Sequence, residues 1–181
     1  MKIHKLLATI AIAAFLAPAA MAQSVGEKTG INSMIGASPT TGDFVKEAAT
    51  SDMFEIQSSQ LAQSKGGVET KTFAAKMVAD HTKTSSDLKS MVQGGTVKAE
   101  LPTEMTTSQK SMLDKLKGLT GEDFNKQYMS DQVSAHKDVV SLFQRYAKSG
   151  ENASLKFWAS KTLPVLQGHL KMAQGLSDKY H

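Results

Sequence analysis

Four residues of this chain have the side chains and the positions to bind a metal ion together. They are one glutamate and three histidines, each near the middle of a different segment with apolar residues at helical spacing: Glu55, His81, His136 and His169. If these segments pack as one bundle, the four side chains meet at about one level of its core. Buried imidazole and carboxylate groups are costly when unpartnered, whereas one divalent ion satisfies several of them. The sequence therefore predicts a site for one transition metal ion: zinc, iron, manganese or copper.

The depth of each residue within its segment agrees with a common level. Counted from the glycines that separate the segments, Glu55, His81 and His136 lie about three to four helical turns deep. His169 lies about five turns deep, and Pro164 before it predicts a kink or a break in that helix. The four polar side chains can therefore meet.

A polar core without a metal explains the same residues. In that interpretation the histidines hydrogen-bond to nearby acidic or amide side chains, for which the candidates are Glu55, Asp80, Asp131 and Gln132. Asp80 points about 100° away from His81 on a helix, so we expect it to support a ligand rather than to bind the ion. The residue pattern leaves both interpretations open.

Methionines stand close in sequence to all three histidines. They are Met77, Met129 and Met172. Thioether and imidazole ligands together suit copper. Methionine also fills irregular gaps in protein cores, and we favour this second explanation.

Five segments have the spacing of helices, and no segment has the alternation of a strand. The predicted helices span residues 41–65, 69–93, 108–117, 120–148 and 153–180. The first is expected to begin with Thr41 or Asp43 near its cap. Four long helices joined at glycines predict an all-α fold, a ferritin-like antiparallel four-helix bundle with one short extra helix between the second and third long helices.

The N-terminal residues have the features of a secretory signal peptide. A basic start and an apolar run from Leu6 to Ala20 precede the small residues Ala20 and Ala22. We therefore expect a signal peptide over residues 1–22, cleavage near Ala22/Gln23, and a periplasmic or secreted product. A flexible leader over 23–40 and a bundle domain over 41–181 should follow, with no transmembrane segment in the mature chain.

Composition excludes several classes of protein. The chain has no cysteine, so neither disulfides nor thiolate ligands contribute. Its formal net charge of +4 falls to about +2 when Lys2 and Lys5 are removed with the signal peptide, and the remaining lysines are scattered. This argues against nucleic acid as a partner. No acid, base or nucleophile stands apart from the predicted metal ligands, so any enzymatic activity would be metal-dependent redox chemistry.

A set of spaced motifs also resembles a known family. They are Asp43-Phe44-Val45 with Glu55-Ile56, Phe73-Ala74 with Met77-Val78-Ala79-Asp80-His81, Leu101-Pro102, Gly121-Glu122-Asp123-Phe124, Gln132-Val133 with His136, and Thr162-Leu163-Pro164 with Leu166 and His169. Over about residues 42–177 the chain resembles the DUF4142 family, exported bacterial proteins of unknown function with a ferritin-like bundle. The resemblance implies that fold, and it matches the four candidate ligands to the family's recurrent polar core. It implies no substrate.

The chain departs from the pattern of di-iron ferritins. Those proteins carry Glu-x-x-His on two helices, but here the three histidines are preceded at that spacing by Val78, Val133 and Leu166. A carboxylate-bridged iron pair is therefore disfavoured. Two functions remain: an exported metal-binding protein in stress tolerance or metal handling, and a metal-free structural or interaction module of the cell envelope whose protein partner is unknown.

Overall fold

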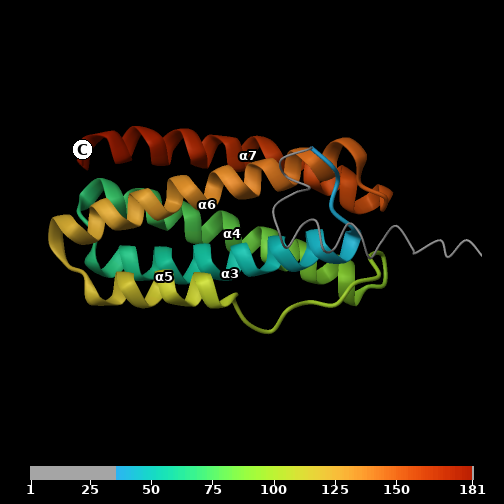
Figure 1. The fold of residues 1–181 in the computed structure, drawn as a ribbon, viewed down its shortest axis with the longest axis horizontal. Coiled ribbons are helices and arrows are strands. Elements are labelled where there is room, and N and C mark those ends of the chain that lie inside the picture. The colour runs from blue at the N-terminus through green and yellow to red at the C-terminus, as the bar shows by residue number, and fades with distance from the viewer. Residues whose placement is uncertain (1–35, 181) are drawn as a thin grey trace, which may run out of the picture.

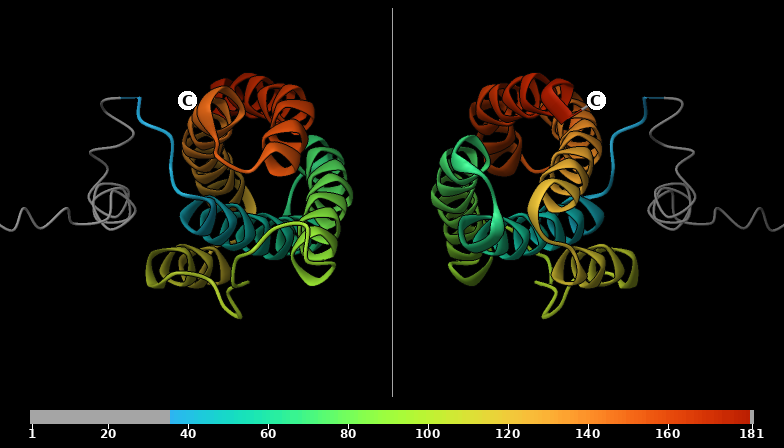
Figure 2. Two further views of the ribbon diagram at one scale, coloured as in Figure 1. Left: turned by 90° about the vertical axis from the view of Figure 1, so that its right-hand side faces the viewer. Right: turned by 90° about the vertical axis from the view of Figure 1, so that its left-hand side faces the viewer.

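The computed structural model describes residues 36–180, and this part of the chain is helical with no strand (Figure 1). Its helices are α3 (Thr41–Lys65), α4 (Val68–Gln93), α5 (Thr107–Gly118), α6 (Gly121–Ser149) and α7 (Ala153–Ser177), followed by a 3₁₀ turn, η1 (Asp178–Tyr180). Seen along the bundle, α3, α4, α7 and α6 surround a common axis, and α5 lies outside beside α3 (Figure 2). The predicted all-α bundle with a short helix between the second and third long helices is confirmed.

Several helices begin at side chains that accept hydrogen bonds from the free backbone N–H groups of the first turn. Thr40 caps α3, directly before Thr41, because its extended backbone lets Oγ1 accept the bond from Asp43 N at 3.1 Å. The short helix α5 starts with a capping box between Thr106 and Gln109. Side-chain caps of this kind define the starts of α3, α5 and α7, whereas α4 and α6 begin without one.

The last helix is not broken at Pro164. It runs from Ala153 to Ser177 with the proline inside it. The prolyl nitrogen cannot bond the carbonyl of Ser160, but both residues are exposed. The unsatisfied carbonyl is therefore not buried, and the helix tolerates the proline.

The bundle core consists of two apolar clusters that are separated by one polar layer. The first cluster includes Phe44, Leu88, Phe143 and Leu155, and the second includes Ala62, Met77, Tyr128 and Ala173. Each long helix adds residues to both clusters, and its candidate ligand lies between the residues of the first cluster and those of the second. These ligands are Glu55 on α3, His81 on α4, His136 on α6 and His169 on α7. The predicted common level of these four residues is therefore confirmed.

The N-terminal predictions fall largely outside the described residues. The signal peptide over 1–22 lies entirely there, as does the leader up to residue 35. Closer to the bundle, the carbonyl of Ala37 accepts a hydrogen bond from Arg145 Nη1 at 2.8 Å, and Pro39 is buried. Between residues 36 and 180, no helix combines the length and the apolar character that crossing a bilayer requires.

Gly168→Ala should raise the free energy of unfolding by about 0.5–1 kcal/mol. Gly168 lies exposed in the middle of α7, and a Cβ atom added there meets nothing within 4 Å. Alanine therefore gains helix propensity without a clash. Urea denaturation of both proteins measures the change.

The opposite result is expected for Gly150→Ala at the end of α6. A Cβ atom at that position would lie 2.5 Å from the ring of buried Tyr146. Overpacking of this kind costs about 1–3 kcal/mol. Equal effects of the two substitutions would contradict the packing described for these glycines.

Candidate metal centre

Three histidines from three helices meet in the polar layer. One ring nitrogen from each of His81, His136 and His169 lies within 4.8 Å of the others. The ring centroids are 5.4 to 5.6 Å apart, and all three side chains are buried. Nitrogen atoms at this separation can reach a single ion placed among them.

One ring nitrogen of each imidazole makes a hydrogen bond that holds the ring in place. His81 Nδ1 lies 2.7 Å from Asp52 Oδ1, His169 Nε2 lies 2.8 Å from Asp80 Oδ2, and His136 Nδ1 lies 2.9 Å from the carbonyl oxygen of Gln132. A carbonyl or a carboxylate oxygen accepts, so these nitrogens carry the hydrogen and donate it. Outer partners of this kind orient the histidines of metal sites.

The nitrogens on the other side of the rings have no hydrogen-bond partner in the described part of the chain. They are His81 Nε2, His136 Nε2 and His169 Nδ1, and all are buried. In a neutral ring whose other nitrogen carries the hydrogen, each of them has a free lone pair. Each of the three histidines therefore keeps one ligand-competent atom buried, away from water.

Glu55 lies beside the three histidines but is not one of their close group. Its Oε1 is 3.7 Å from His136 Nδ1, the nitrogen that bonds Gln132. Both carboxylate oxygens are buried without a hydrogen-bond partner among residues 36–180. The geometry brings the histidines together as predicted, while Glu55 as the fourth ligand stays a prediction.

The family of the chain can now be stated. A sequence profile described as Domain of unknown function (DUF4142) matches residues 27–176. The chain belongs to the DUF4142 family. Neither a curated protein nor a solved structure matches it. The family resemblance found in the sequence is confirmed, whereas membership in DUF4142 assigns no activity and the ferritin-like relationship stays a prediction.

Burial keeps two of the three imidazoles in this DUF4142 chain neutral. It lowers the pKa of His136 to about 3, helped by the nearby charges of His81 and His169. Burial also lowers the pKa of His169 to about 4, although the bond to Asp80 opposes this shift. Neutral imidazole is the form that binds a metal ion.

The pKa values of Glu55 and His81 shift upward, unlike those of His136 and His169. Burial raises the pKa of Glu55 to about 7, although the charge of His81 opposes that shift. Burial also lowers the pKa of His81, but the hydrogen bond and charge of Asp52 outweigh it and raise the pKa above its ordinary value. Burial raises the pKa of Asp52 as well, although the hydrogen bond and the charge of His81 oppose that shift.

Asp52 is the residue of the candidate site that sequence reasoning missed. It stands three residues before Glu55 on α3, so the two side chains share a helix face. An acidic residue at that spacing was the available signal. Of the partners that were predicted instead, Asp131 accepts a bond from Gln127 Nε2, and Gln132 supports His136 through its backbone carbonyl.

The methionines near the histidines belong to the packing. Met77 and Met129 are buried in the second apolar cluster, and Met172 is partly exposed on α7. This agrees with methionine as a gap filler and gives no support to a thioether ligand.

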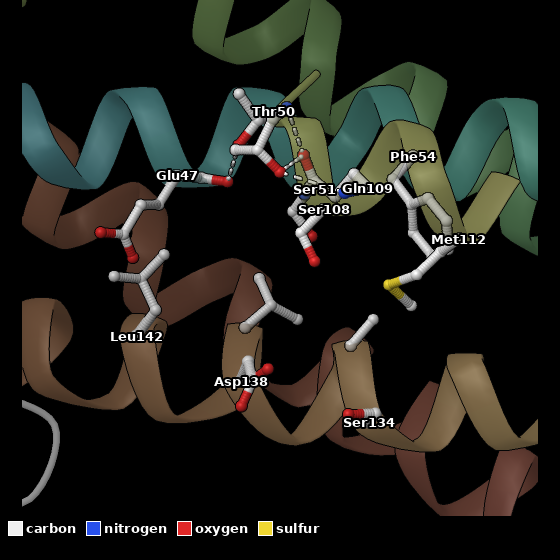
Figure 3. Close-up of a pocket in the computed structure, with 13 residues that line it drawn as sticks. Glu47, Thr50, Ser51, Phe54, Ser108, Gln109, Met112, Ser134, Asp138 and Leu142 are labelled. Atoms are coloured by element: carbon white, nitrogen blue, oxygen red, sulfur yellow. Dashed lines mark hydrogen bonds between the residues drawn. The ribbon is translucent and has the colours of Figure 1, made fainter. Parts of the chain in front are cut away.

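A pocket on the outer side of the bundle does not include the histidines. It has a volume of about 360 Å³ between α3, α5 and α6, and Figure 3 shows Glu47, Ser51, Gln109 and Asp138 among its walls. None of the four candidate ligands lines it. The pocket is therefore distinct from the group of three histidines.

Proposed function

We propose that this DUF4142 protein is exported and binds one transition metal ion through His81, His136 and His169, with Glu55 as the fourth ligand. The observation that supports the proposal best is the group of three buried histidines, each of which has one ring nitrogen without a hydrogen-bond partner in the described chain. Metal handling or stress tolerance in the periplasm or outside the cell is the function that such a site suits.

A metal-free polar core accounts for these atoms less well. In such a core, buried polar atoms bond to one another, and leaving one unsatisfied costs about 1–3 kcal/mol. Here the three ring nitrogens and both oxygens of Glu55 have no partner within residues 36–180. A bound cation would provide a partner for the lone pairs of the three ring nitrogens together.

The donor set also limits the metal. Three neutral imidazoles and one carboxylate suit zinc, iron, manganese or copper(II), since thioether and thiolate donors that favour copper(I) are absent from the cluster. One carboxylate is too few for the carboxylate-bridged iron pair of di-iron bundles. The proposal is therefore a mononuclear site.

The competing proposal is a metal-free interaction module of the cell envelope. The observation in its favour is a groove of about 520 Å³ between α4 and α7, where Val68 and Met172 expose apolar side chains. Exposed apolar surface of this kind is typical of a contact with a partner. It does not explain the unpartnered atoms of the polar layer, so we rank it second.

Elemental analysis of protein exported to its native compartment tests metal binding. We expect about one transition metal ion per chain in the wild type and none in His81→Ala. His181→Ala, the same substitution at the chain end, is the matched control and should retain the ion. The melting temperature should rise with metal in the wild type and in the control alone. Wild-type protein with neither stoichiometric metal nor a metal-dependent melting shift would overturn the proposal.

A further inference from the structure

The histidine cluster is closed to solvent except near one of its supporting groups. Asp52, which holds His81, has a side chain that is 8% exposed, and Gln132, which holds His136, is fully buried. Asp80, which holds His169, has a side chain that is 30% exposed. Among the groups that hold the three rings, Asp80 is therefore the one that reaches both a buried histidine and the surface.

Asp80 lies in the least tightly packed seam of the bundle. The backbones of α4 and α7 approach each other closely at fewer positions than those of α3 and α4 or of α6 and α7. A hollow of about 270 Å³ adjoins Asp80 in this seam, and its lining includes Lys83, Asp87, Trp158 and Lys161. The groove with Lys76 and Met172 continues along the same two helices. The surface is therefore indented next to Asp80.

The carboxylate of Asp80 has one oxygen free for a cation. Lys76 Nζ and His169 Nε2 both donate to Oδ2, each at 2.8 Å. No hydrogen bond from residues 36–180 reaches Oδ1. An ion that approaches the seam meets this charged oxygen before any buried nitrogen.

We propose that the metal ion reaches the cluster through the seam between α4 and α7, with the Asp80 carboxylate as its first contact and His169 as the next. This inference rests on the proposed function, because it assigns a route to the same site. It assigns different roles to two aspartates that make similar hydrogen bonds. Asp52 positions the ligand His81, whereas Asp80 positions the ligand His169 and also receives the ion.

The test compares Asp80→Asn with Asp52→Asn. In both variants the amide oxygen can still accept the bond from the imidazole, but the negative charge is lost. Metal-free protein is mixed rapidly with Co²⁺, and the visible absorption of the bound ion follows association; release is measured by mixing loaded protein with a chelator. Asp114→Asn, at an exposed aspartate of α5 that also bonds a lysine, controls for net charge.

We expect Asp80→Asn to lower the association rate constant about tenfold, since a lost steering charge acts on association. Asp52→Asn should raise the dissociation rate constant and leave association within about twofold, as a purely positioning residue would. Equal association rates for Asp80→Asn and wild type, or equal slowing in both variants, would overturn the route. Failure of the wild type to bind Co²⁺ would instead overturn the proposed function.

Discussion

Glu55→Gln is expected to stabilise the metal-free protein by about 2–3 kcal/mol at pH 8 and to have little effect at pH 4. Glu55 is fully buried, and burial raises its pKa from 4.5 to about 7. Below pH 4.5 the residue is protonated in both the folded and the unfolded chain. As the pH rises to 7 and above, the unfolded chain releases the proton first, so the folded protein loses stability. Glutamine has no proton to release and avoids this loss.

Urea denaturation in the presence of a chelator at the two pH values measures the effect. Glu100→Gln, at an exposed residue with no helical role, is the matched control and should be neutral at both pH values. A Glu55→Gln variant that is less stable than the wild type at pH 8 would contradict the prediction, because it would mean that the carboxylate is well paired in the metal-free protein.

Metal should reverse the sign of this result. If Glu55 binds the ion, saturating Zn²⁺ stabilises the wild type more than Glu55→Gln, because binding to the folded state adds RT ln(1 + [L]/Kd) and the amide is the weaker ligand. A residue that destabilises the metal-free protein and stabilises the metal-bound protein contributes to metal binding rather than to the stability of the fold. An equal Zn²⁺ effect in both proteins would remove Glu55 from the ligand set while leaving the histidines in place.

The level of the four polar residues could be predicted from the sequence because two local signals agree. Apolar spacing defines the inward face of each helix, and the glycines that end the helices define depth along it. Both signals depend on residues that are near one another in the chain. They place Glu55, His81, His136 and His169 between two apolar clusters, as the structure has them.

The orientation of these groups could not be predicted in the same way. Spacing indicates that Asp80 points away from His81, but that it faces His169 depends on α7 lying next to α4, and the order of helices around a bundle is not a local property. Asp52 reaches His81 from another helix for the same reason. The side-chain torsion of Glu55, which turns its carboxylate toward His136 Nδ1, is set by packing and leaves no trace in the residue pattern.

His136→Leu separates the two proposed functions most directly. His136 is fully buried, and its ring donates to the carbonyl of Gln132 one turn earlier in α6. That carbonyl also takes part in the backbone ladder of the helix, so losing the ring leaves no unpaired partner behind. If the histidines serve a metal, the leucine variant should be at least as stable as the metal-free wild type at pH 7.5 and should gain nothing from Zn²⁺.

Acid should widen the difference in stability between His136→Leu and the wild type. The pKa of His136 in the folded protein is about 3, against an ordinary value of 6.5. Below pH 6.5 the unfolded wild type binds a proton that the folded protein does not, so its stability falls with pH. At pH 4.5 this amounts to about 2–3 kcal/mol that the leucine variant does not lose. Chemical denaturation of both proteins at pH 7.5 and 4.5, with chelator throughout, measures the difference.

The result that would contradict a metal site is a large loss of stability in His136→Leu at pH 7.5 without metal. A metal-free polar core holds together through its own hydrogen bonds, and removing one member of it leaves buried partners unsatisfied at a cost of about 1–3 kcal/mol each. A metal site that holds no ion has no such bonds to lose on its inner side. Because the hydrogen bond of His136 goes to a backbone carbonyl that stays paired, a variant that keeps its stability fits both proposals, and the loss of the Zn²⁺ effect in His136→Leu is the result that distinguishes a ligand from a packing residue.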